Sequence, residues 1–416
     1  MTVLRVDGDR LWRSLMELAE IGATARGGVC RLTLSDEDRR ARERFVAWAR
    51  AAGLDAHVDA IGNIRCRRPG ADPEAPSVAM GSHLDSQPSG GKFDGAYGVL
   101  AGLEVMRTLA EAGVRTRAPL EVISWTNEEG SRFVPVMMGS GVVAGVFPLA
   151  YCLAQRDLEG RTVGEELARI GYAGDAPMTP PGAYFEAHIE QGPVLEQTGD
   201  TIGVVVGALG QRWFDAVLTG QDAHAGPTPM HARRDALLAA ARLVLEVNRI
   251  ACEAPGYARG TVGQMLVRPN SRNVVPGEVG MSVEFRNDDE GRLDAMVAEL
   301  AESIAGIERE TGVAVRLQEV TRFAPCRFDA GMVEAVREAA RAFGYRHRDI
   351  VSGAGHDAVY MARVAPSAMI FVPCAGGLSH NEAEWATPED LAAGANVLLA
   401  AVLARAGVAQ SEEVVR

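Results

Sequence analysis

The feature that most constrains the fold is an ordered series of strand and helix patterns in the middle of the chain. The strand-like segments are residues 213–218, 261–267, 279–285 and 313–317, and the helical segments are residues 236–250 and 293–307. The clearest strand has Val279, Met281, Val283 and Phe285 at alternate positions, which is typical of a half-buried strand. The order β-α-β-β-α-β is that of a ferredoxin-like split unit. It predicts a separate α+β domain over residues 212–327.

The segments on both sides of this unit alternate strand and helix in another way. The strand-like segments are residues 77–82, 120–126, 184–189 and 368–372, and the helical segments are residues 95–109, 332–343 and 391–406. Ser35 followed by Asp38 predicts a capping box at the start of one more helix. This alternation is typical of an α/β fold with a mostly parallel sheet covered by helices. We therefore expect one discontinuous catalytic domain over residues 1–211 and 328–416.

The charge and the cysteines exclude several classes of partner and location. The 416 residues carry a net charge of −13 and contain no long lysine or arginine run, which argues against nucleic acid and anionic membranes as partners. We see no signal peptide and no apolar stretch long enough to cross a membrane. The six cysteines form no CxxC pair and are expected to be reduced. We therefore expect a cytoplasmic protein.

A first group of polar residues follows the strand at residues 77–82, in GSHLDS and GGKFDG. His83 and Asp85 lie two residues apart, on one side of an extended chain. We expect the Asp85 carboxylate to hold one ring nitrogen of His83, as carboxylates do for metal-binding imidazoles. Asp94 follows a glycine-rich loop, and its two oxygens suit it to bridge two cations. A surface turn with a helix-capping aspartate is the alternative for this segment alone.

Three further groups follow later strands, in NEEGSRF, HIEQGPVLE and CAGGLSHNEAEW. Glu128 and Glu129 are adjacent, so on an extended chain their carboxylates point opposite ways. One of them can bind metal while the other acts as a general base. Taken singly, each group also fits an exposed acidic turn, a core histidine or a surface loop.

Together the groups supply a mixed nitrogen and oxygen donor set that suits Zn²⁺, Mn²⁺ or Co²⁺. The expected metal ligands are His83, Asp94, Glu129, His188 and His380. We expect two divalent ions in each subunit, with Asp94 bridging them and one histidine on each.

These residues, in this order, resemble the dinuclear metal aminoacylase/carboxypeptidase superfamily. The closer resemblance is to its amidase branch, which comprises N-carbamoyl-L-amino acid hydrolase, β-ureidopropionase and allantoate amidohydrolase. The motifs that carry it span roughly residues 27–385 and are GGVCRLTLSD, GSHLDSQPSGGKFDG, NEEGSRF, HIEQGPVLE, GQRWFD, AHAGPTPM, NVVPG, SGAGHDA and SHNEAEW. HIEQG discriminates most, because peptidase relatives commonly have an acidic ligand at the position of His188.

The resemblance also implies a role for each matching residue. The five ligands above bind metal, and Glu128 resembles the general base, beside Asp85 of the H-x-D motif. His224 resembles a histidine that the inserted domain of a dimer partner contributes to stabilise the oxyanion. Asn273 and Arg286 resemble the residues that hold the substrate carboxylate. Gln191, Gln211 and Gly355 resemble further substrate contacts. The inserted domain then acts as a lid and carries the interface of a homodimer.

The function that follows is hydrolysis of the carbamoyl C–N bond of a small molecule, an N-carbamoyl-L-amino acid. The products are the amino acid, CO₂ and ammonia. β-Ureidopropionase, allantoate amidohydrolase and a dipeptidase or aminoacylase remain alternatives within the superfamily. A non-catalytic metal protein predicts loss of Glu128, which is present, and a serine hydrolase predicts a G-x-S-x-G motif, which Ser140 does not provide. His356 either orients a neighbour of the site or caps the helix after it.

Overall fold

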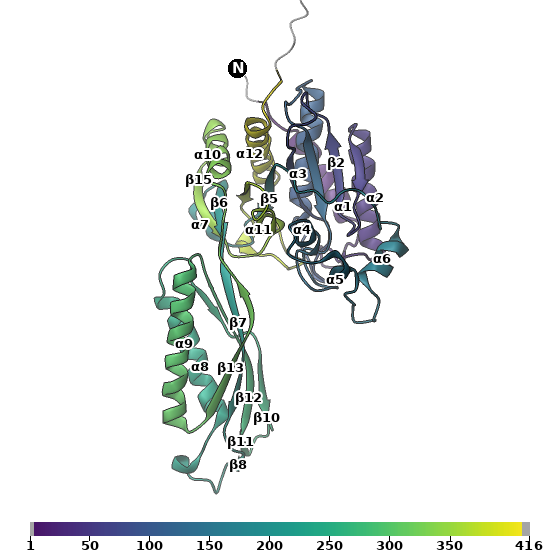
Figure 1. The fold of residues 1–416 in the computed structure, drawn as a ribbon. Coiled ribbons are helices and arrows are strands. Elements are labelled where there is room, and N and C mark those ends of the chain that lie inside the picture. The colour runs from purple at the N-terminus through teal and green to yellow at the C-terminus, as the bar shows by residue number, and fades with distance from the viewer. Residues whose placement is uncertain (1–3, 410–416) are drawn as a thin grey trace, which may run out of the picture. The chain divides into compact units, whose positions relative to one another are not determined.

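The computed structural model describes residues 4–409, and the chain divides into two compact units (Figure 1). The first unit runs to Val206 and resumes at Arg327, and the second is Gly207–Cys326. The boundaries predicted from the sequence patterns, at residues 212 and 328, lie five residues and one residue later than these. Among the described residues, no helix is both long enough and apolar enough to cross a bilayer.

The first unit is built around a nine-stranded mixed sheet in the order β1-β2-β4-β3-β5-β16-β6-β14, with β15 also paired to β6. The strands are β1 (Asp55–Val58), β2 (Ile64–Arg68), β3 (Val78–His83), β4 (Leu120–Trp125), β5 (Ala183–Ile189), β6 (Ile202–Ala208), β14 (Cys326–Arg327), β15 (His347–Ser352) and β16 (Ser367–Val372). The four central strands β4, β3, β5 and β16 are parallel, which confirms the predicted α/β class. Every residue of these four strands is buried, as in a sheet covered on both faces.

The outer part of this sheet is antiparallel, which the sequence did not reveal. The strand β2 runs antiparallel to β4 and to β1, and β6 runs antiparallel to β16. A short connection explains the antiparallel pairing of β1 with β2, because only a few residues join them whereas a parallel pair needs a long crossover.

The helices of the first unit pack against both sides of the sheet. They are α1 (Gly8–Ala19), α2 (Asp36–Ala51), α3 (Ala96–Glu111), α4 (Met138–Val143), α5 (Leu149–Leu153), α6 (Val163–Ile170), α7 (Val194–Thr198), α10 (Ala330–Ala342), α11 (Asp357–Met361) and α12 (Pro388–Ala406), with a 3₁₀ turn at Ala375–Gly377. Ser35 caps α2 by accepting from the Asp38 amide at 3.2 Å. The expected capping box is incomplete, because the Asp38 carboxylate accepts from the Leu34 amide at 2.8 Å instead of from Ser35.

The second unit has a five-stranded antiparallel sheet in the order β10-β12-β7-β13, with β9 paired to β12. Its elements are β7 (Gly210–Thr219), β8 (Ala223–His224), a 3₁₀ turn (Met230–Ala232), α8 (Ala236–Glu253), β9 (Arg259–Thr261), β10 (Met265–Arg268), β11 (Val274–Val275), β12 (Glu278–Asn287), α9 (Glu290–Thr311) and β13 (Ala314–Phe323). The single strand expected at residues 261–267 is two strands, β9 and β10, and β8 with β11 forms an additional small sheet.

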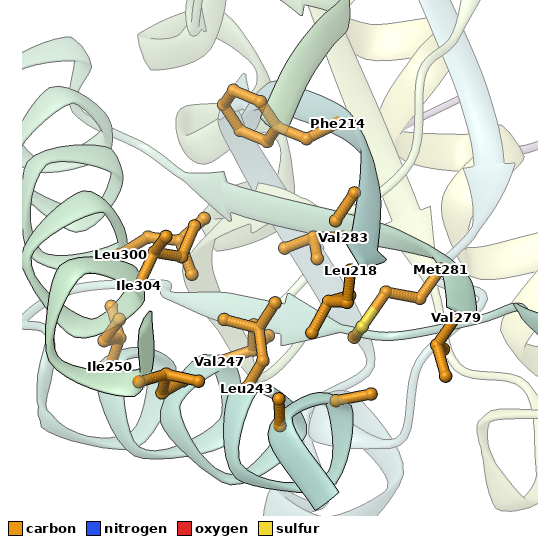
Figure 2. Packing of buried hydrophobic residues seen from close by; sticks show 14 of the residues in the cluster. Phe214, Leu218, Leu243, Val247, Ile250, Val279, Met281, Val283, Leu300 and Ile304 are labelled. Atoms are coloured by element: carbon orange, nitrogen blue, oxygen red, sulfur yellow. The ribbon is translucent and has the colours of Figure 1, made fainter. Parts of the chain in front are cut away.

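One hydrophobic cluster joins the two long helices of this unit to one face of its sheet (Figure 2). Leu243, Val247 and Ile250 of α8 pack with Leu300 and Ile304 of α9. The strand β12 alternates half-buried and buried residues along its whole length, as its sequence predicts. The second unit therefore has a core of its own.

Candidate active site

The residues of the expected metal site lie at or beyond the carboxyl ends of the four parallel strands. His83 is the last residue of β3, and His188 is next to the end of β5. The chain reaches Glu129 soon after β4 and His380 after β16. Because β3, β4, β5 and β16 are parallel, these ends lie along one edge of the sheet, where open α/β sheets bind ligands.

Asp94 lies at the centre of this group, in the loop before α3, and only 5% of its surface is exposed. Its Oδ1 atom is 3.6 Å from His83 Nε2 and 3.3 Å from His188 Nε2. Its Oδ2 atom is 3.3 Å from His380 Nε2. The next residue must be glycine, because Gly95 has a φ of +63° and a Cβ there would lie 2.3 Å from the His83 ring.

The donor atoms form two groups that share Asp94. The first group is His83, Asp94 and His188, and the second is Asp94, Glu129 and His380. Each carboxylate oxygen of Asp94 faces a different group, which is the arrangement that a bridging ligand needs. Each group contains a histidine, and the third histidine joins the first group, because β3 and β5 bring His83 and His188 to the same side of Asp94.

Both buried histidines present the correct nitrogen to this centre. His83 Nδ1 is 2.9 Å from the backbone oxygen of Asp85, and His188 Nδ1 is 2.9 Å from that of Ile189. A carbonyl oxygen can only accept, so each Nδ1 carries the hydrogen. This leaves each Nε2 atom facing Asp94, as metal coordination requires, and His188 Nε2 also accepts from the Gly95 amide at 3.2 Å. The donor set and its tautomers therefore fit divalent cations.

The Asp85 carboxylate has different hydrogen-bond partners from the one expected. Its carboxylate is 3.8 Å from His83 Nδ1, too far for a hydrogen bond, because the backbone oxygen of Asp85 occupies that position. The carboxylate instead accepts from the Thr33 hydroxyl at 2.7 Å and from the amides of Glu128 and Glu129 at 3.4 and 3.3 Å. Asp85 thus holds the peptide that carries the two glutamates.

The two glutamates point to different histidines. Glu128 Oε2 is 3.5 Å from His83 Nε2, whereas Glu129 Oε2 is 3.3 Å from His380 Nε2. The cause is a turn rather than an extended chain, because β4 ends at Trp125 and Asn127 has a φ of +56°. Glu128 belongs to neither ligand group, so it is available for proton transfer.

Burial and neighbouring charged groups shift the pKa of each acid in the cluster. Burial raises the pKa of Glu128 well above its usual value, and burial with the charge of Asp94 raises that of Glu129 to about 7. Burial also opposes ionisation of Asp94, but its three histidine partners hold its pKa well below the usual value. A hydrogen bond to Asp94 raises the pKa of His380 to about 9. Divalent cations would therefore displace protons from these side chains on binding.

The structure decides between the two expectations for His356. Its ring makes no capping hydrogen bond to α11, although the residue precedes that helix. The ring centroid lies 4.5 Å from that of His188, and Nε2 is 3.0 Å from the Ser352 hydroxyl. Burial lowers the pKa of His356 well below its usual value, so the ring is neutral. His356 packs against His188, one of the expected ligands, instead of capping the helix.

Two of the expected substrate contacts lie in the first unit. Gln191 has a φ of +57° and donates to Asp94 Oδ2 and to the Ser379 hydroxyl, both at 3.0 Å. Gln191 Oε1 is buried without a hydrogen-bond partner. Gly355 faces Met137, whose Cε atom would lie 3.2 Å from a Cβ at that position. Only Gln191 is therefore in contact with the expected metal ligands.

The other four expected contacts form two pairs in the second unit. The strands β8 and β11 set His224 opposite Val274, and the Ala225 amide donates to the oxygen of Asn273 at 2.8 Å. Gln211 and Arg286 are opposite each other on β7 and β12.

These two pairs lie toward opposite ends of one ladder. The ladder from Gln211 to Thr219 spans about 26 Å at about 3.3 Å per residue, and β8 follows its far end (Figure 1). One small molecule therefore cannot contact both Asn273 and Arg286 of a single copy.

Gln87 and Thr33 contact acids of this site and were not predicted from the sequence. Gln87 donates to Glu129 Oε2 at 2.6 Å, and its own oxygen accepts from the Ser131 hydroxyl at 2.7 Å. The Thr33 hydroxyl donates to Asp85. Both lie inside quoted motifs, GSHLDSQPSGG and GGVCRLTLSD, so their position in these motifs was the available signal.

Known proteins that match this chain over most of its length belong to a family of metal-dependent hydrolases. The model of peptidase family M20/M25/M40 matches residues 79–404. An N-carbamoyl-L-amino-acid amidohydrolase of Rhizobium meliloti is 50% identical over 408 residues, which cover 98% of each chain. An allantoate amidohydrolase of Bacillus subtilis is 35% identical and covers 92% of this chain and 93% of its own.

The solved structures agree. An amidase of the hydantoinase/carbamoylase family from Burkholderia multivorans superposes with a TM-score of 0.95 at 57% identity, over 97% of this chain and 98% of its own. The M20 family is metal-dependent, and the described residues include histidine and carboxylate groups able to hold metal. The chain therefore belongs to peptidase family M20/M25/M40 and, within it, to the hydantoinase/carbamoylase amidases, which are hydrolases of amide C–N bonds.

Proposed function

We propose that this protein hydrolyses the carbamoyl C–N bond of N-carbamoyl-L-amino acids. Water adds to the carbamoyl carbon, the bond to the amino acid nitrogen breaks, and the carbamic acid released decomposes to CO₂ and ammonia. The observation that carries the proposal is the similarity to the Rhizobium meliloti amidohydrolase, 50% identical over 98% of both chains. The two ligand groups around Asp94 support the same chemistry.

We propose that two divalent cations, Zn²⁺, Mn²⁺ or Co²⁺, bind at these groups. His83, Asp94 and His188 would hold one, and Asp94, Glu129 and His380 would hold the other. When bound, such a pair supplies Lewis acidity that polarises a carbonyl group and acidifies water. All five side chains are imidazoles or carboxylates, the ligand types that these ions accept.

In this proposal Glu128 is the general base of the reaction. Its carboxylate is buried, belongs to neither ligand group and lies 3.5 Å from His83. Burial raises its pKa, so it can accept a proton from water and pass it to the departing nitrogen. Asp85 fixes the base by accepting from its backbone amide.

The two residue pairs of the second unit support a homodimer. If Asn273 and Arg286 both hold the substrate carboxylate, they come from different copies, because the ladder separates them within one copy. His224 accompanies Asn273, and we propose that it stabilises the oxyanion. The outer face of α8 offers apolar surface for pairing, because Leu238 and Leu245 are two turns apart and are 47% and 69% exposed.

Mixed dimers test this arrangement. The variants His224→Ala and Arg286→Ala are each expected to have little activity. After denaturation and refolding together, half of the random dimers are mixed, and each mixed dimer has one site with both residues. About a quarter of the wild-type activity is then expected to return. If mixing restores no activity, the two pairs do not come from different copies.

Ammonia release tests the substrate assignment. The protein is stripped of metal, reloaded with Mn²⁺, Co²⁺ or Zn²⁺, and offered N-carbamoyl-L- and D-amino acids, N-carbamoyl-β-alanine, allantoate and dipeptides. We expect the fastest metal-dependent release from an N-carbamoyl-L-amino acid. Fastest release from allantoate would favour the activity named for the Bacillus subtilis relative. Cleavage of dipeptides without ammonia release would contradict the amidase assignment.

A further inference from the structure

Glu384 is a buried carboxylate that the proposed chemistry does not use. It belongs to the turn after His380, and only 2% of its surface is exposed. Its Oε1 atom accepts from the backbone amides of Phe93 and Asp94 at 2.9 and 3.1 Å. Its Oε2 atom accepts from the Ser379 hydroxyl at 2.8 Å. One side chain therefore contacts both the loop that carries Asp94 and the loop that carries His380.

Ser379 continues this connection to the ligand itself. Its hydroxyl oxygen is 3.2 Å from Asp94 Oδ2 and accepts from Gln191 Nε2 at 3.0 Å. The hydroxyl has a single hydrogen, and the shorter contact favours Glu384 as its acceptor. The orientation of Asp94 is thus fixed at its backbone by Glu384 and at its carboxylate by Gln191.

The glycine-rich loop leaves space for this carboxylate. A Cβ at Gly91 would lie 2.0 Å from Glu384 Cδ and 2.1 Å from its Oε1. Gly91 does not have a positive φ, so the close approach of Glu384 is what requires glycine there. The neighbouring turn is also held in place, because the Trp385 ring packs edge-on against Phe93 with centroids 5.9 Å apart.

We infer that Glu384 is a positioning residue of the metal centre, which holds the Asp94 loop and the His380 loop in one fixed arrangement. A carboxylate suits this task because both of its oxygens only accept, and three donors converge on it. Glu384 is in neither ligand group, so it acts through Asp94 and His380. The inference rests on the proposed metal-dependent function, since Asp94 is shared by both groups.

The test measures Co²⁺ affinity in the absence of substrate, by competition with a chelator, and records the visible absorption spectrum of the bound Co²⁺. Glu384→Ala removes all three acceptor contacts, and a loss of about 10–100-fold in affinity is expected. Glu384→Gln retains an oxygen for the two backbone amides, so we expect it to restore most of the affinity. The number of Co²⁺ ions bound at saturation stays that of the wild type, because no ligand is lost.

Two further variants separate this role from a general loss of structure. Glu382→Gln changes a glutamate of the same turn that faces Arg26 at 3.8 Å, and its affinity and spectrum are expected to match the wild type. Gly91→Ala removes no hydrogen-bonding group but displaces the Glu384 carboxylate, so a lower affinity is expected even if Glu384→Ala fails to fold.

Three results would overturn the inference, and they differ in whether the proposed function also fails. Wild-type affinity with an unchanged spectrum in both Glu384→Ala and Gly91→Ala removes the positioning role and leaves the proposed function intact. A smaller number of bound ions at saturation in Glu384→Ala makes Glu384 a ligand itself. A wild-type protein that binds no Co²⁺, Mn²⁺ or Zn²⁺ contradicts the proposed function and this inference together.

Discussion

The two ligand groups share Asp94 but differ in how the chain builds them. His83 and His188 are each 1% exposed and lie at the ends of central strands, with their Nδ1 atoms bonded to backbone oxygens. In the other group, His380 lies on a loop and has a φ of +52°, and its side chain is 52% exposed. The first group is therefore fixed by the sheet, whereas the second depends on contacts between loops.

This difference indicates that the first group is held more rigidly than the second. Buried strand ends leave the first group little freedom, because the strands β3 and β5 are hydrogen-bonded neighbours. Glu129 in the second group depends on Gln87, which donates to it through both its backbone and its side chain. We expect the first group to bind metal more tightly, and the following changes test this comparison.

The largest effect is expected from Asp94→Asn, which has the same shape but lacks the charge that both groups share. Both ions should bind far more weakly, and activity should fall by more than about 10⁴-fold. Metal content by mass spectrometry and ammonia release check this. Asp55→Asn, at an exposed position of β1, is the matched control. Full occupancy of either group in Asp94→Asn would show that the carboxylate is not shared.

Glu128→Gln should lower kcat by about 10²–10⁴-fold and leave the metal content unchanged, because the residue transfers protons and is in neither group. Glu129→Gln, one residue away, should instead lose metal from the second group. Steady-state kinetics together with metal analysis separate the two outcomes. A Glu128→Gln enzyme that retains turnover is incompatible with the assigned base.

Graded removal of metal should separate the two groups. With increasing chelator we expect two steps whose midpoints differ by about tenfold or more, and the group with exposed His380 should empty first. His380→Ala should abolish the first step and keep the second. A single step for both ions would mean that exposure of His380 does not decide affinity.

The smallest effect is expected from Thr33→Val, which removes the hydroxyl that donates to Asp85 at 2.7 Å. A hydrogen bond to a carboxylate contributes about 1.5–3 kcal/mol, and only part of it bears on the reaction, so kcat/KM should fall by about tenfold. Thr198→Val at the end of α7 is the control, since its hydroxyl is exposed. A loss as large as that of Glu128→Gln would give Asp85 a larger role than holding one peptide.

Much of the fold could be predicted because strong patterns determine it locally. The alternation in β12 and the fully buried central strands both follow from the order of apolar residues. The expected ligands could be named because each stands in a short motif at or beyond the carboxyl end of such a strand. The antiparallel outer strands could not be predicted, because their direction depends on which strands pair and not on their own residues.

The finer contacts of the site depend on groups that are distant in sequence. The Asp85 carboxylate is used by Thr33 and the Glu128–Glu129 peptide, and no local rule gives that choice over His83. Likewise Asn273 and Arg286 look equivalent in sequence, and only the register of β7 with β12 shows how far apart they lie. The spacing of residues predicts which face of a helix or strand a side chain occupies. It does not predict which of several donors that side chain contacts.

The backbone oxygens that accept from His83 and His188 affect which substitutions the site can tolerate during evolution. Every amino acid supplies a carbonyl, so no substitution at Asp85 or Ile189 can delete the acceptor that sets each imidazole tautomer. Only a change in the course of the strands can do so. The acceptor that sets each tautomer therefore persists through substitutions at positions 85 and 189, whatever those substitutions do to the side-chain contacts there.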